Sequence, residues 1–295
     1  MSSSFLERVR SGELLISDGA TGTNLLARGL PRGMPGEAWV LERPDEIVRL
    51  LGDFIQAGAD ILLTCTFGAS PLRLAGSEFA DRSGEINRRA VALAREAIHD
   101  RPLYVGASLG PTGQLLKPFG PLDEQEAIDS YLEQVKALVE AGVDLFAIET
   151  QFSLEEAQAA LKAIRMTTDL PVVCSFSFDR GTRTMMGVRP AQMASELTPL
   201  GVDILGINCG RSLEENLLVL KELRQATDLP IWFKPNAGLP EVDEAGQAHY
   251  AVTPEAMGQK VPEWLAAGAQ IVGGCCGTTP DHLQRIARQV RSQKN

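Results

Sequence analysis

The sequence has few aromatic residues, few histidines and no long apolar run. Only 5% of its residues are aromatic, and three are histidines. Residues 1–13 carry charges from Glu7 onward and contain no apolar stretch of signal-peptide length. No segment approaches the roughly 20 consecutive apolar residues that a membrane-spanning helix needs. These absences argue against secretion and membrane insertion, and we expect the chain in the cytoplasm.

Positive charge and cysteine are also scarce. The 28 Lys and Arg residues are outnumbered by 38 Asp and Glu residues, which gives a formal net charge of -10. Nucleic acid and anionic membranes both require a basic surface, so neither is expected as a partner. Five cysteines in 295 residues, without a signal peptide, indicate a reducing compartment and not a disulfide framework.

Short apolar runs alternate with segments of helical periodicity along the whole chain. Most runs are rich in Ile, Leu, Val and Phe, as expected for strands buried on both faces of a parallel sheet. The predicted strands are Leu14–Ser17, Ile61–Thr66, Leu103–Ala107, Leu145–Glu149, Val172–Phe178, Ile204–Asn208, Ile231–Lys234 and Gln270–Gly273. The predicted helices include Pro44–Ala57, Glu85–Ile98, Asp123–Glu140, Leu154–Met166, Leu213–Thr227 and Pro280–Val290.

The joints between these segments alternate in type. Gly58, Gly142, Gly201 and Gly268 precede the even-numbered strands, where glycine is the left-handed cap that ends a helix. An Asp-x-Pro sequence precedes strands three, five and seven, and proline also stops a helix. Eight such units predict an α/β fold with a single (β/α)8 TIM barrel domain over residues 1–295. Functional residues of such barrels lie at the carboxyl ends of the strands.

Three cysteines fall at these carboxyl ends. Cys209 follows the sixth strand, and Cys275 and Cys276 follow the eighth, within a glycine-rich segment that could leave strand geometry. Three thiolates suit zinc and leave its fourth position open to a substrate thiol. A zinc bound by thiolates keeps that sulfur electron-rich, which suits attack on a methyl carbon. The alternative is that these cysteines are small apolar fillers of a glycine-rich turn.

Two acids also end strands, Asp18 after the first and Glu149 after the fourth. Buried carboxylates need partners, and the ammonium group of a substrate would satisfy both. The turn that contains Gly19, Ala20 and Thr21 could bind a carboxylate through its backbone amides. Together with the zinc, these groups would hold an amino acid that bears a thiol. Alternatively, Asp18 caps the following helix and Glu149 pairs with an arginine.

The remaining cysteines and the histidines are left out of the predicted site. Cys174 lies within the fifth strand and is expected in the core, and Cys65 has no clear direction near the end of the second. His99, His249 and His282 lie in polar segments and are expected to be solvated. The polar loop 239–253 could be a lid, an interface or a solvated loop.

Six motifs, in order along the chain, resemble those of the homocysteine S-methyltransferase family, above all the homocysteine-binding module of cobalamin-dependent methionine synthases. The motifs are Asp18-Gly19-Ala20-Thr21-Gly22-Thr23, Thr66-Phe67-Gly68-Ala69, Gly110-Pro111-Thr112-Gly113, Gly206-Ile207-Asn208-Cys209, Pro235-Asn236-Ala237-Gly238 and Gly273-Gly274-Cys275-Cys276-Gly277-Thr278-Thr279-Pro280. The resemblance implies Zn2+ on the three cysteines, L-homocysteine held by Asp18, Glu149 and the turn amides, and methionine as product. It also places Asn208 and Asn236 near the site, where they are expected among the substrate-binding residues.

The resemblance leaves the methyl donor open. The 295 residues contain no Asp-x-His-x-x-Gly corrinoid-binding motif and leave no room for corrinoid or folate modules, so the donor is expected from outside the chain. We rank a methylcorrinoid first, either methylcobalamin or a separate corrinoid protein. S-methylmethionine or S-adenosylmethionine comes second and betaine third. Two further hypotheses are a homocysteine-presenting subunit with little activity alone, and a barrel whose cysteines bind no catalytic metal.

Overall fold

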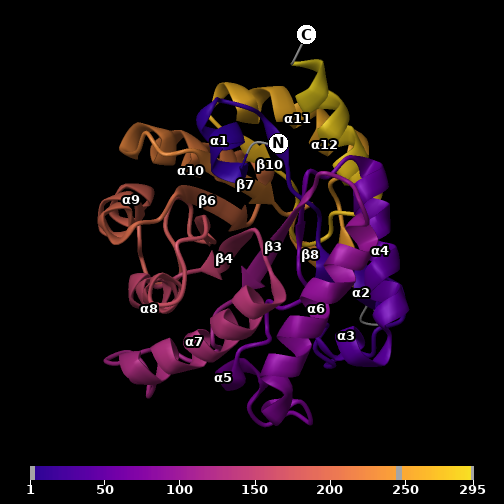
Figure 1. Cartoon of the computed structure of the whole chain (residues 1–295). Coiled ribbons are helices and arrows are strands. Elements are labelled where there is room, and N and C mark those ends of the chain that lie inside the picture. The colour runs from indigo at the N-terminus through magenta and orange to yellow at the C-terminus, as the bar shows by residue number, and fades with distance from the viewer. Residues whose placement is uncertain (1–3, 244–247, 294–295) are drawn as a thin grey trace.

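Eight parallel strands form one sheet in the computed structural model, which describes residues 4–243 and 248–293. The strand order is β1-β10-β7-β6-β5-β4-β3-β2, and a parallel bridge between Ser17 and Ile61 joins the two ends of this order. The sheet is therefore closed, and the helices surround it (Figure 1). The prediction of a (β/α)8 barrel is confirmed. Among the described residues, no helix combines the length and the apolar character needed to cross a membrane.

The observed elements follow the predicted alternation. The barrel strands are β1 Leu15–Ile16, β2 Ile61–Leu63, β3 Tyr104–Leu109, β4 Leu145–Gln151, β5 Val172–Phe176, β6 Ile204–Cys209, β7 Ile231–Pro235 and β10 Ile271–Val272. The helices are α1 Phe5–Arg10, α2 Thr21–Ala27, α3 Ala38–Glu42, α4 Pro44–Ala57, α5 Pro71–Leu74, α6 Ser83–Ile98, α7 Glu124–Ala141, α8 Leu154–Arg165, α9 Pro190–Leu197, α10 Leu213–Ala226, α11 Pro254–Ala266 and α12 Pro280–Ser292. Two 3-10 turns, η1 Ala80–Arg82 and η2 Thr198–Leu200, precede α6 and follow α9. Strands β8 Pro240–Val242 and β9 Ala248–Tyr250 form a separate antiparallel hairpin.

The glycine joints adopt the predicted left-handed conformation. Gly58 and Gly142 have φ angles of 109° and 84°, and Gly201 and Gly268 have φ angles of 84° and 100°. The second strand is shorter than predicted, because the chain turns directly after Leu63. In that turn the N–H of Thr66 donates to the carbonyl of Thr64 at 2.9 Å, and the two threonine hydroxyls lie 2.7 Å apart.

The barrel interior is packed with side chains and closed at its amino-terminal end. Inward-facing residues from the strands form one buried cluster: Leu15, Ile61, Leu63, Leu145, Ala147, Val173, Ile204, Trp232 and Ile271. Helix α1 adds Phe5 and Val9 to this cluster, and the ring of Phe5 packs edge-on against Tyr104 at the start of β3. The carboxyl ends of the strands are therefore the open end of the barrel.

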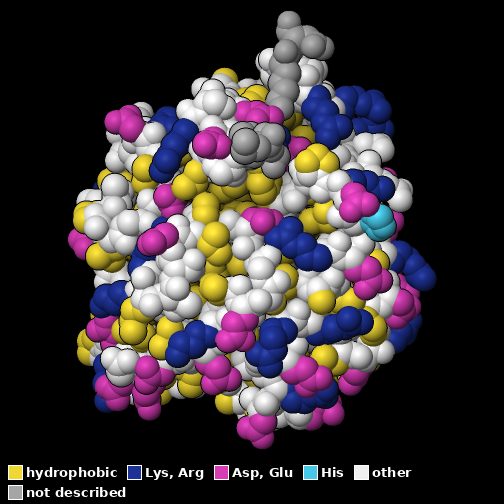
Figure 2. Space-filling view, in the orientation of Figure 1, with side chains coloured by type: hydrophobic (Ala, Val, Ile, Leu, Met, Phe, Trp, Pro, Cys, Tyr) yellow, Lys and Arg dark blue, Asp and Glu magenta, His cyan; other side chains and the backbone are white. Residues whose placement is uncertain are grey.

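The face of the molecule in Figure 2 mixes the two signs of charge. Lys and Arg side chains are interspersed with Asp and Glu side chains over most of this face, and several gather at its upper right. This distribution agrees with the net charge of -10.

Candidate metal and substrate site

The sulfur atoms of Cys209, Cys275 and Cys276 converge at the carboxyl ends of the strands. Their Sγ atoms all lie within 4.8 Å of one another, and those of Cys209 and Cys275 are 2.9 Å apart. Cys209 is the last residue of β6, and its φ of 59° turns the chain away from the strand. Cys275 and Cys276 lie in the loop that follows β10.

Close backbone packing shapes the loop that holds the cysteine pair. A Cβ on Gly273 would lie 2.7 Å from the carbonyl oxygen of Asp18, and one on Gly274 would lie 2.4 Å from Thr278 Oγ1. The N–H of Gly274 donates to the Asp18 carbonyl at 3.0 Å. Only glycine allows these approaches, so the chain can leave strand geometry and turn both cysteines toward one point.

The three thiols cannot all ionise together without a cation. Hydrogen bonds from Cys209 and Cys275 lower the pKa of Cys276 to about 3. The same contacts with Cys275 and Cys276 raise the pKa of Cys209 well above its usual value. One thiolate is therefore favoured at the expense of its neighbours. A donor set of three sulfurs fits zinc, because a dication would take the place of the remaining protons.

A cavity of about 440 Å³ opens beside the sulfurs. Its lining includes the three cysteines and five more residues of the predicted site: Gly19, Ala20, Thr21, Glu149 and Asn208. Asp18 is fully buried and Asn236 is 8% exposed, and within the described chain neither contributes to this lining. The structure therefore brings the predicted residues to one end of the barrel but places two of them behind the cavity wall.

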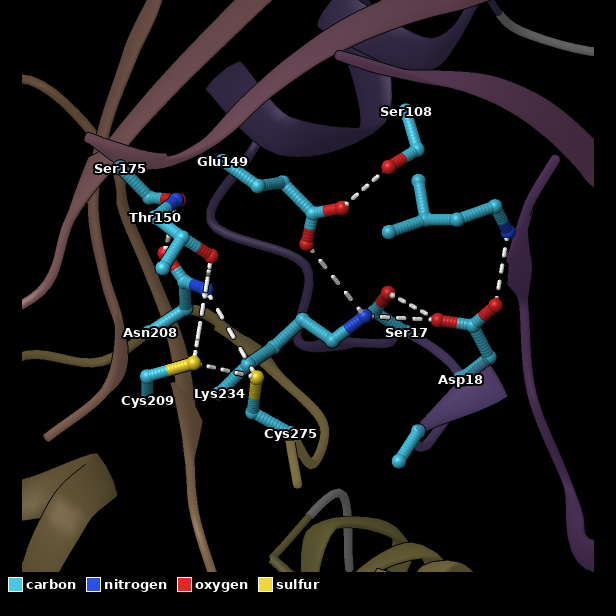
Figure 3. A network of polar contacts seen from close by, with 12 residues as sticks. Ser17, Asp18, Ser108, Glu149, Thr150, Ser175, Asn208, Cys209, Lys234 and Cys275 are labelled. Atoms are coloured by element: carbon cyan, nitrogen blue, oxygen red, sulfur yellow. Dashed lines mark hydrogen bonds and ion pairs between the residues drawn. The ribbon is translucent and has the colours of Figure 1, made fainter. Parts of the chain in front are cut away.

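Lys234 is the main charged residue that sequence reasoning missed. It lies in β7, is 2% exposed, and places its Nζ 2.7 Å from Asp18 Oδ1 and 3.9 Å from Glu149 Oε2 (Figure 3). Burial lowers the pKa of Lys234, but the two carboxylates outweigh this and raise it, so the ammonium stays charged. A lysine at the end of an otherwise apolar strand was the signal in the sequence.

Asp18 and Glu149 have different environments. Asp18 accepts hydrogen bonds from Lys234 and, at 2.7 Å, from the N–H of Leu63 in the neighbouring strand β2. It does not cap α2, whose N-cap is Ala20 and which no side chain of the described residues caps. Glu149 accepts a hydrogen bond from Ser108 Oγ at 2.6 Å, and burial raises its pKa to about 7 against the opposing effect of Lys234. The arginine partner considered for Glu149 is replaced by this lysine.

The two predicted asparagines occupy different places. Asn208 contacts the sulfurs: its Nδ2 lies 3.6 Å from Cys209 Sγ and 3.7 Å from Cys275 Sγ. Asn236 donates to the carbonyl of Gly210 at 2.8 Å, and its Oδ1 has no hydrogen-bond partner among the described residues.

The prediction that all three histidines are solvated is wrong for His282. This residue is 6% exposed, and its Nε2 lies 2.8 Å from the carbonyl oxygen of Val252, while Nδ1 lies 2.9 Å from Thr279 Oγ1. The sequence suggested a polar helix start, but His282 is the third residue of α12 and completes its capping box. It therefore ties α12 to the segment after the hairpin.

The segment 239–253 forms the β8–β9 hairpin, of which residues 244–247 lie outside the described chain. Tyr250 ends β9, and its ring lies so close to Gly277 that a Cβ there would be 2.2 Å from it. Cys174 is fully buried in β5, as predicted, and Cys65 lines the cavity; the described metal-binding cluster includes neither. Tyr250, at the end of the hairpin, therefore packs against the cysteine loop at Gly277.

The family model and the relatives with the highest sequence identity belong to one family. The family model described as homocysteine S-methyltransferase matches residues 15–290. The chain is 31% identical over 97% of its length to a methionine synthase of Mycobacterium tuberculosis, and 30% identical over 94% to that of Mycobacterium leprae. It spans about a quarter of the length of each, 25% and 24%. The metallated homocysteine methyltransferase MmuM of Escherichia coli has a similar structure, with a TM-score of 0.82, 26% identity, and coverage of 96% of this chain and 98% of that one.

Proposed function

The chain belongs to the homocysteine S-methyltransferase family, and on this premise we propose that it methylates the sulfur of L-homocysteine to form methionine. In this proposal Cys209, Cys275 and Cys276 hold zinc, and residues 1–295 act as one homocysteine-binding unit. The observation that carries the proposal is the convergence of three sulfurs, within 4.8 Å of one another, on the wall of a cavity of about 440 Å³.

Glu149 is the residue that we assign to the substrate ammonium. Its Oε2 lies 3.9 Å from Lys234 Nζ, beyond hydrogen-bonding distance, so this oxygen can accept from a ligand. The carboxylate of Asp18 is already engaged by Lys234 and by a backbone N–H, so we assign it to holding that lysine. An ammonium near Glu149 would also lower the pKa of about 7 that burial gives this group.

The substrate carboxylate is assigned to the turn at the start of α2. Gly19, Ala20 and Thr21 line the cavity, and α2 begins at Thr21 without a capping side chain among the described residues. The N–H of Ala20 donates to Thr278 Oγ1 at 3.1 Å, which leaves the amides on either side of it for the ligand. The amino acid would then be held at both ends, with its side chain directed at the sulfurs.

When bound, zinc supplies a Lewis acid that keeps a substrate thiol deprotonated at neutral pH. The residues assigned above to the ammonium and the carboxylate of the substrate orient that thiol toward the open end of the barrel. The sulfur electron pair forms the new bond to the methyl carbon, and the leaving group departs with the electrons of the broken bond. No general base is required, which agrees with the buried structural role of His282.

A methylcorrinoid is the donor that we rank first. Large apolar side chains are exposed on segments that follow the barrel strands, around the open end: Leu26, Phe67, Phe119, Met185, Leu239 and Val242. We propose that these side chains act together as an apolar rim, of the kind that a large partner covers. This arrangement supports a donor presented from outside by a corrinoid or its carrier protein.

A small sulfonium donor is the second candidate, and one observation favours it. Glu37 is 7% exposed, lines the cavity together with Phe67, and accepts a hydrogen bond from the N–H of Gly68 at 2.5 Å. An acidic residue and an aromatic ring in one cavity lining suit a cation such as a sulfonium. These two residues therefore keep S-methylmethionine and S-adenosylmethionine as alternatives, with betaine third.

The metal assignment is tested by comparing Cys275→Ala with Cys174→Ala. Both remove one buried or partly buried thiol, but only the first lies in the cluster. We expect about one zinc per chain in the wild type and in Cys174→Ala, and loss of zinc and of methionine formation in Cys275→Ala. Full zinc content and turnover in Cys275→Ala would refute the assignment.

The donor is tested by offering homocysteine with four methyl donors in parallel and measuring methionine. The donors are methylcobalamin, S-methylmethionine, S-adenosylmethionine and betaine. We expect the fastest turnover with methylcobalamin, and faster turnover with S-methylmethionine would establish the sulfonium alternative. Binding of homocysteine without turnover by any donor, combined with stimulation by a methylcorrinoid protein, would indicate a presenting subunit.

A further inference from the structure

Asn208 links the cysteine cluster to strands β4 and β5. It precedes Cys209 in β6 and is 1% exposed. Its Nδ2 lies 3.6 Å from Cys209 Sγ and 3.7 Å from Cys275 Sγ, and 2.7 Å from Thr150 Oγ1 (Figure 3). One side-chain amide therefore faces two of the three sulfurs.

The orientation of the Asn208 amide is fixed by a backbone N–H, which can donate a hydrogen bond but cannot accept one. The backbone N–H of Thr150 points at Asn208 Oδ1 at 2.8 Å, and a backbone N–H can only donate. The atom that faces it must be the amide oxygen, so the NH2 group must face the sulfurs. Thr150 holds this direction with a φ of 59°, which is rare and strained for a β-branched residue. Such strain persists where the surrounding structure requires it.

Ser175 fixes the same orientation of the Asn208 amide with a second hydrogen bond. This serine lies in β5, is fully buried, and donates its hydroxyl hydrogen to Asn208 Oδ1 at 2.7 Å. Its Cβ comes so close to Gly206 that a Cβ there would be only 2.8 Å away. The amide oxygen of Asn208 thus accepts from two rigid strand positions, and both hold the NH2 group toward Cys209 and Cys275.

We propose that Asn208 is a positioning residue of the metal centre and that Ser175 fixes its orientation. One N–H of its amide donates to Thr150 Oγ1, and the other donates to the sulfurs of Cys209 and Cys275, which share it. This inference rests on the zinc site proposed above, and it replaces the expectation that Asn208 binds substrate. The N–H that faces the sulfurs withdraws electron density from them. Three thiolates around one dication carry an excess of negative charge, and hydrogen bonds from Asn208 moderate it. Hydrogen bonds of this kind orient ligands and tune the metal.

The inference is tested with Co2+ as a spectroscopic probe of the sulfurs. Asn208→Leu keeps a side chain of similar shape but removes the donor. We expect the sulfur-to-cobalt charge-transfer band to move to longer wavelength, because sulfurs without N–H donors are richer in electrons. Zinc affinity, measured by competition with a chelator, should fall by about 10- to 100-fold. Ser175→Ala should shift both readouts in the same direction by less.

Two control variants separate this role from simple support of the fold. Asn87→Leu changes a buried asparagine of α6, and Ser130→Ala a buried serine of α7, both outside the cluster. Both should keep the wild-type band position and zinc affinity, even if they unfold at lower temperature.

Wild-type values of band position and affinity in both Asn208→Leu and Ser175→Ala would overturn the inference. If Asn208→Leu does not fold, Ser175→Ala decides alone. Absence of Co2+ and Zn2+ binding by the wild type would refute the metal proposal itself, and that outcome is distinct from an unchanged spectrum in a variant that binds metal.

Discussion

At the scale of single residues, Lys234 and Asp18 form an ion pair in the wall of the barrel. Their side chains are 3% and 0% exposed, and the Nζ–Oδ1 distance is 2.7 Å. Removal of one member of a buried pair leaves an uncompensated charge, which costs about 3–5 kcal/mol. We therefore expect Lys234→Met to lower the free energy of unfolding by about this amount, measured by urea denaturation, and Asp18→Asn in the same chain to restore much of the loss.

An exposed pair of nearly the same length provides the control. Lys117 and Asp123 are separated by 2.8 Å, but their side chains are 59% and 56% exposed. Lys117→Met should lower the free energy of unfolding far less than Lys234→Met does, because water screens this pair. Equal losses in Lys117→Met and Lys234→Met, or no recovery in the double variant, would contradict the proposed buried coupling.

The residues of the site differ in how far the sequence could predict them. Glycines flank the cysteine pair, and glycine at these positions gives the backbone freedom to leave strand geometry. The departure of this segment from the strand was therefore predictable. The direction of Lys234 was not, because an apolar parallel strand shows no alternation that separates inward from outward positions. The partner of His282 lies 30 residues away at Val252, so its burial depends on a tertiary contact that periodicity does not encode.

At the scale of elements, the long periodic helices and the strand order were predictable, whereas short elements were not. Helix α4 has the predicted limits Pro44–Ala57, since proline begins it and Gly58 ends it. Helix α1 has six residues and depends on burial of Phe5 and Val9 in the barrel, so its local sequence gives a weak signal. The β8–β9 hairpin is mostly exposed, and its strands of 3 residues each are too short for their alternation to predict them.

The contact between this hairpin and the cysteine loop gives an element-scale prediction. Gly277 has a φ of 80°, and a Cβ there would lie 2.2 Å from the Tyr250 ring. Gly277→Ala should destabilise the protein by about 1–3 kcal/mol from backbone strain, with the clash added, in chemical denaturation. Tyr250→Ala in the same chain should relieve the clash but not the strain. If the double variant is no more stable than Gly277→Ala, the hairpin does not press on this loop.

Glu156 gives a second prediction at this scale, because it joins α8 to the loop after β3. Its Oε1 accepts from the N–H and hydroxyl of Thr112 at 2.6 and 2.7 Å, and from Tyr131 OH at 3.2 Å. Burial has the largest effect on this carboxyl, and it raises the pKa of Glu156 above 4.5, the ordinary value for a glutamate side chain. A raised acid pKa favours the folded state at low pH, and this contribution is lost as the pH rises through the folded-state pKa.

The free energy of unfolding of the wild type should therefore fall relative to Glu156→Gln as the pH rises from 4.5 toward neutrality. For one proton the slope cannot exceed about 1.4 kcal/mol per pH unit. Denaturation of both proteins across this range measures the difference. A difference that is independent of pH would show that Glu156 has the same pKa in the folded and unfolded chains.

At the scale of the whole molecule, metal binding should stabilise the fold, because the cysteines come from distant parts of the chain. Ligand binding to the folded state alone adds about 4 kcal/mol when the free metal is at 1,000 times its Kd. We expect a higher unfolding temperature with zinc, reversed by a chelator, in the wild type and in Cys174→Ala. Cys275→Ala should show no such increase, and an equal increase in Cys275→Ala would place the stabilising metal elsewhere.

The position of β10 between β1 and β7 has a consequence for the order of synthesis. During translation β1 is made first, yet its neighbour on one side is made only when residues 271–272 emerge from the ribosome. Cys209 is likewise synthesised before Cys275 and Cys276, while the barrel is incomplete. A nascent chain therefore cannot gather the three sulfurs before nearly all of the barrel strands are in place. Metal would then bind only late, to closed barrels and not to partly folded ones.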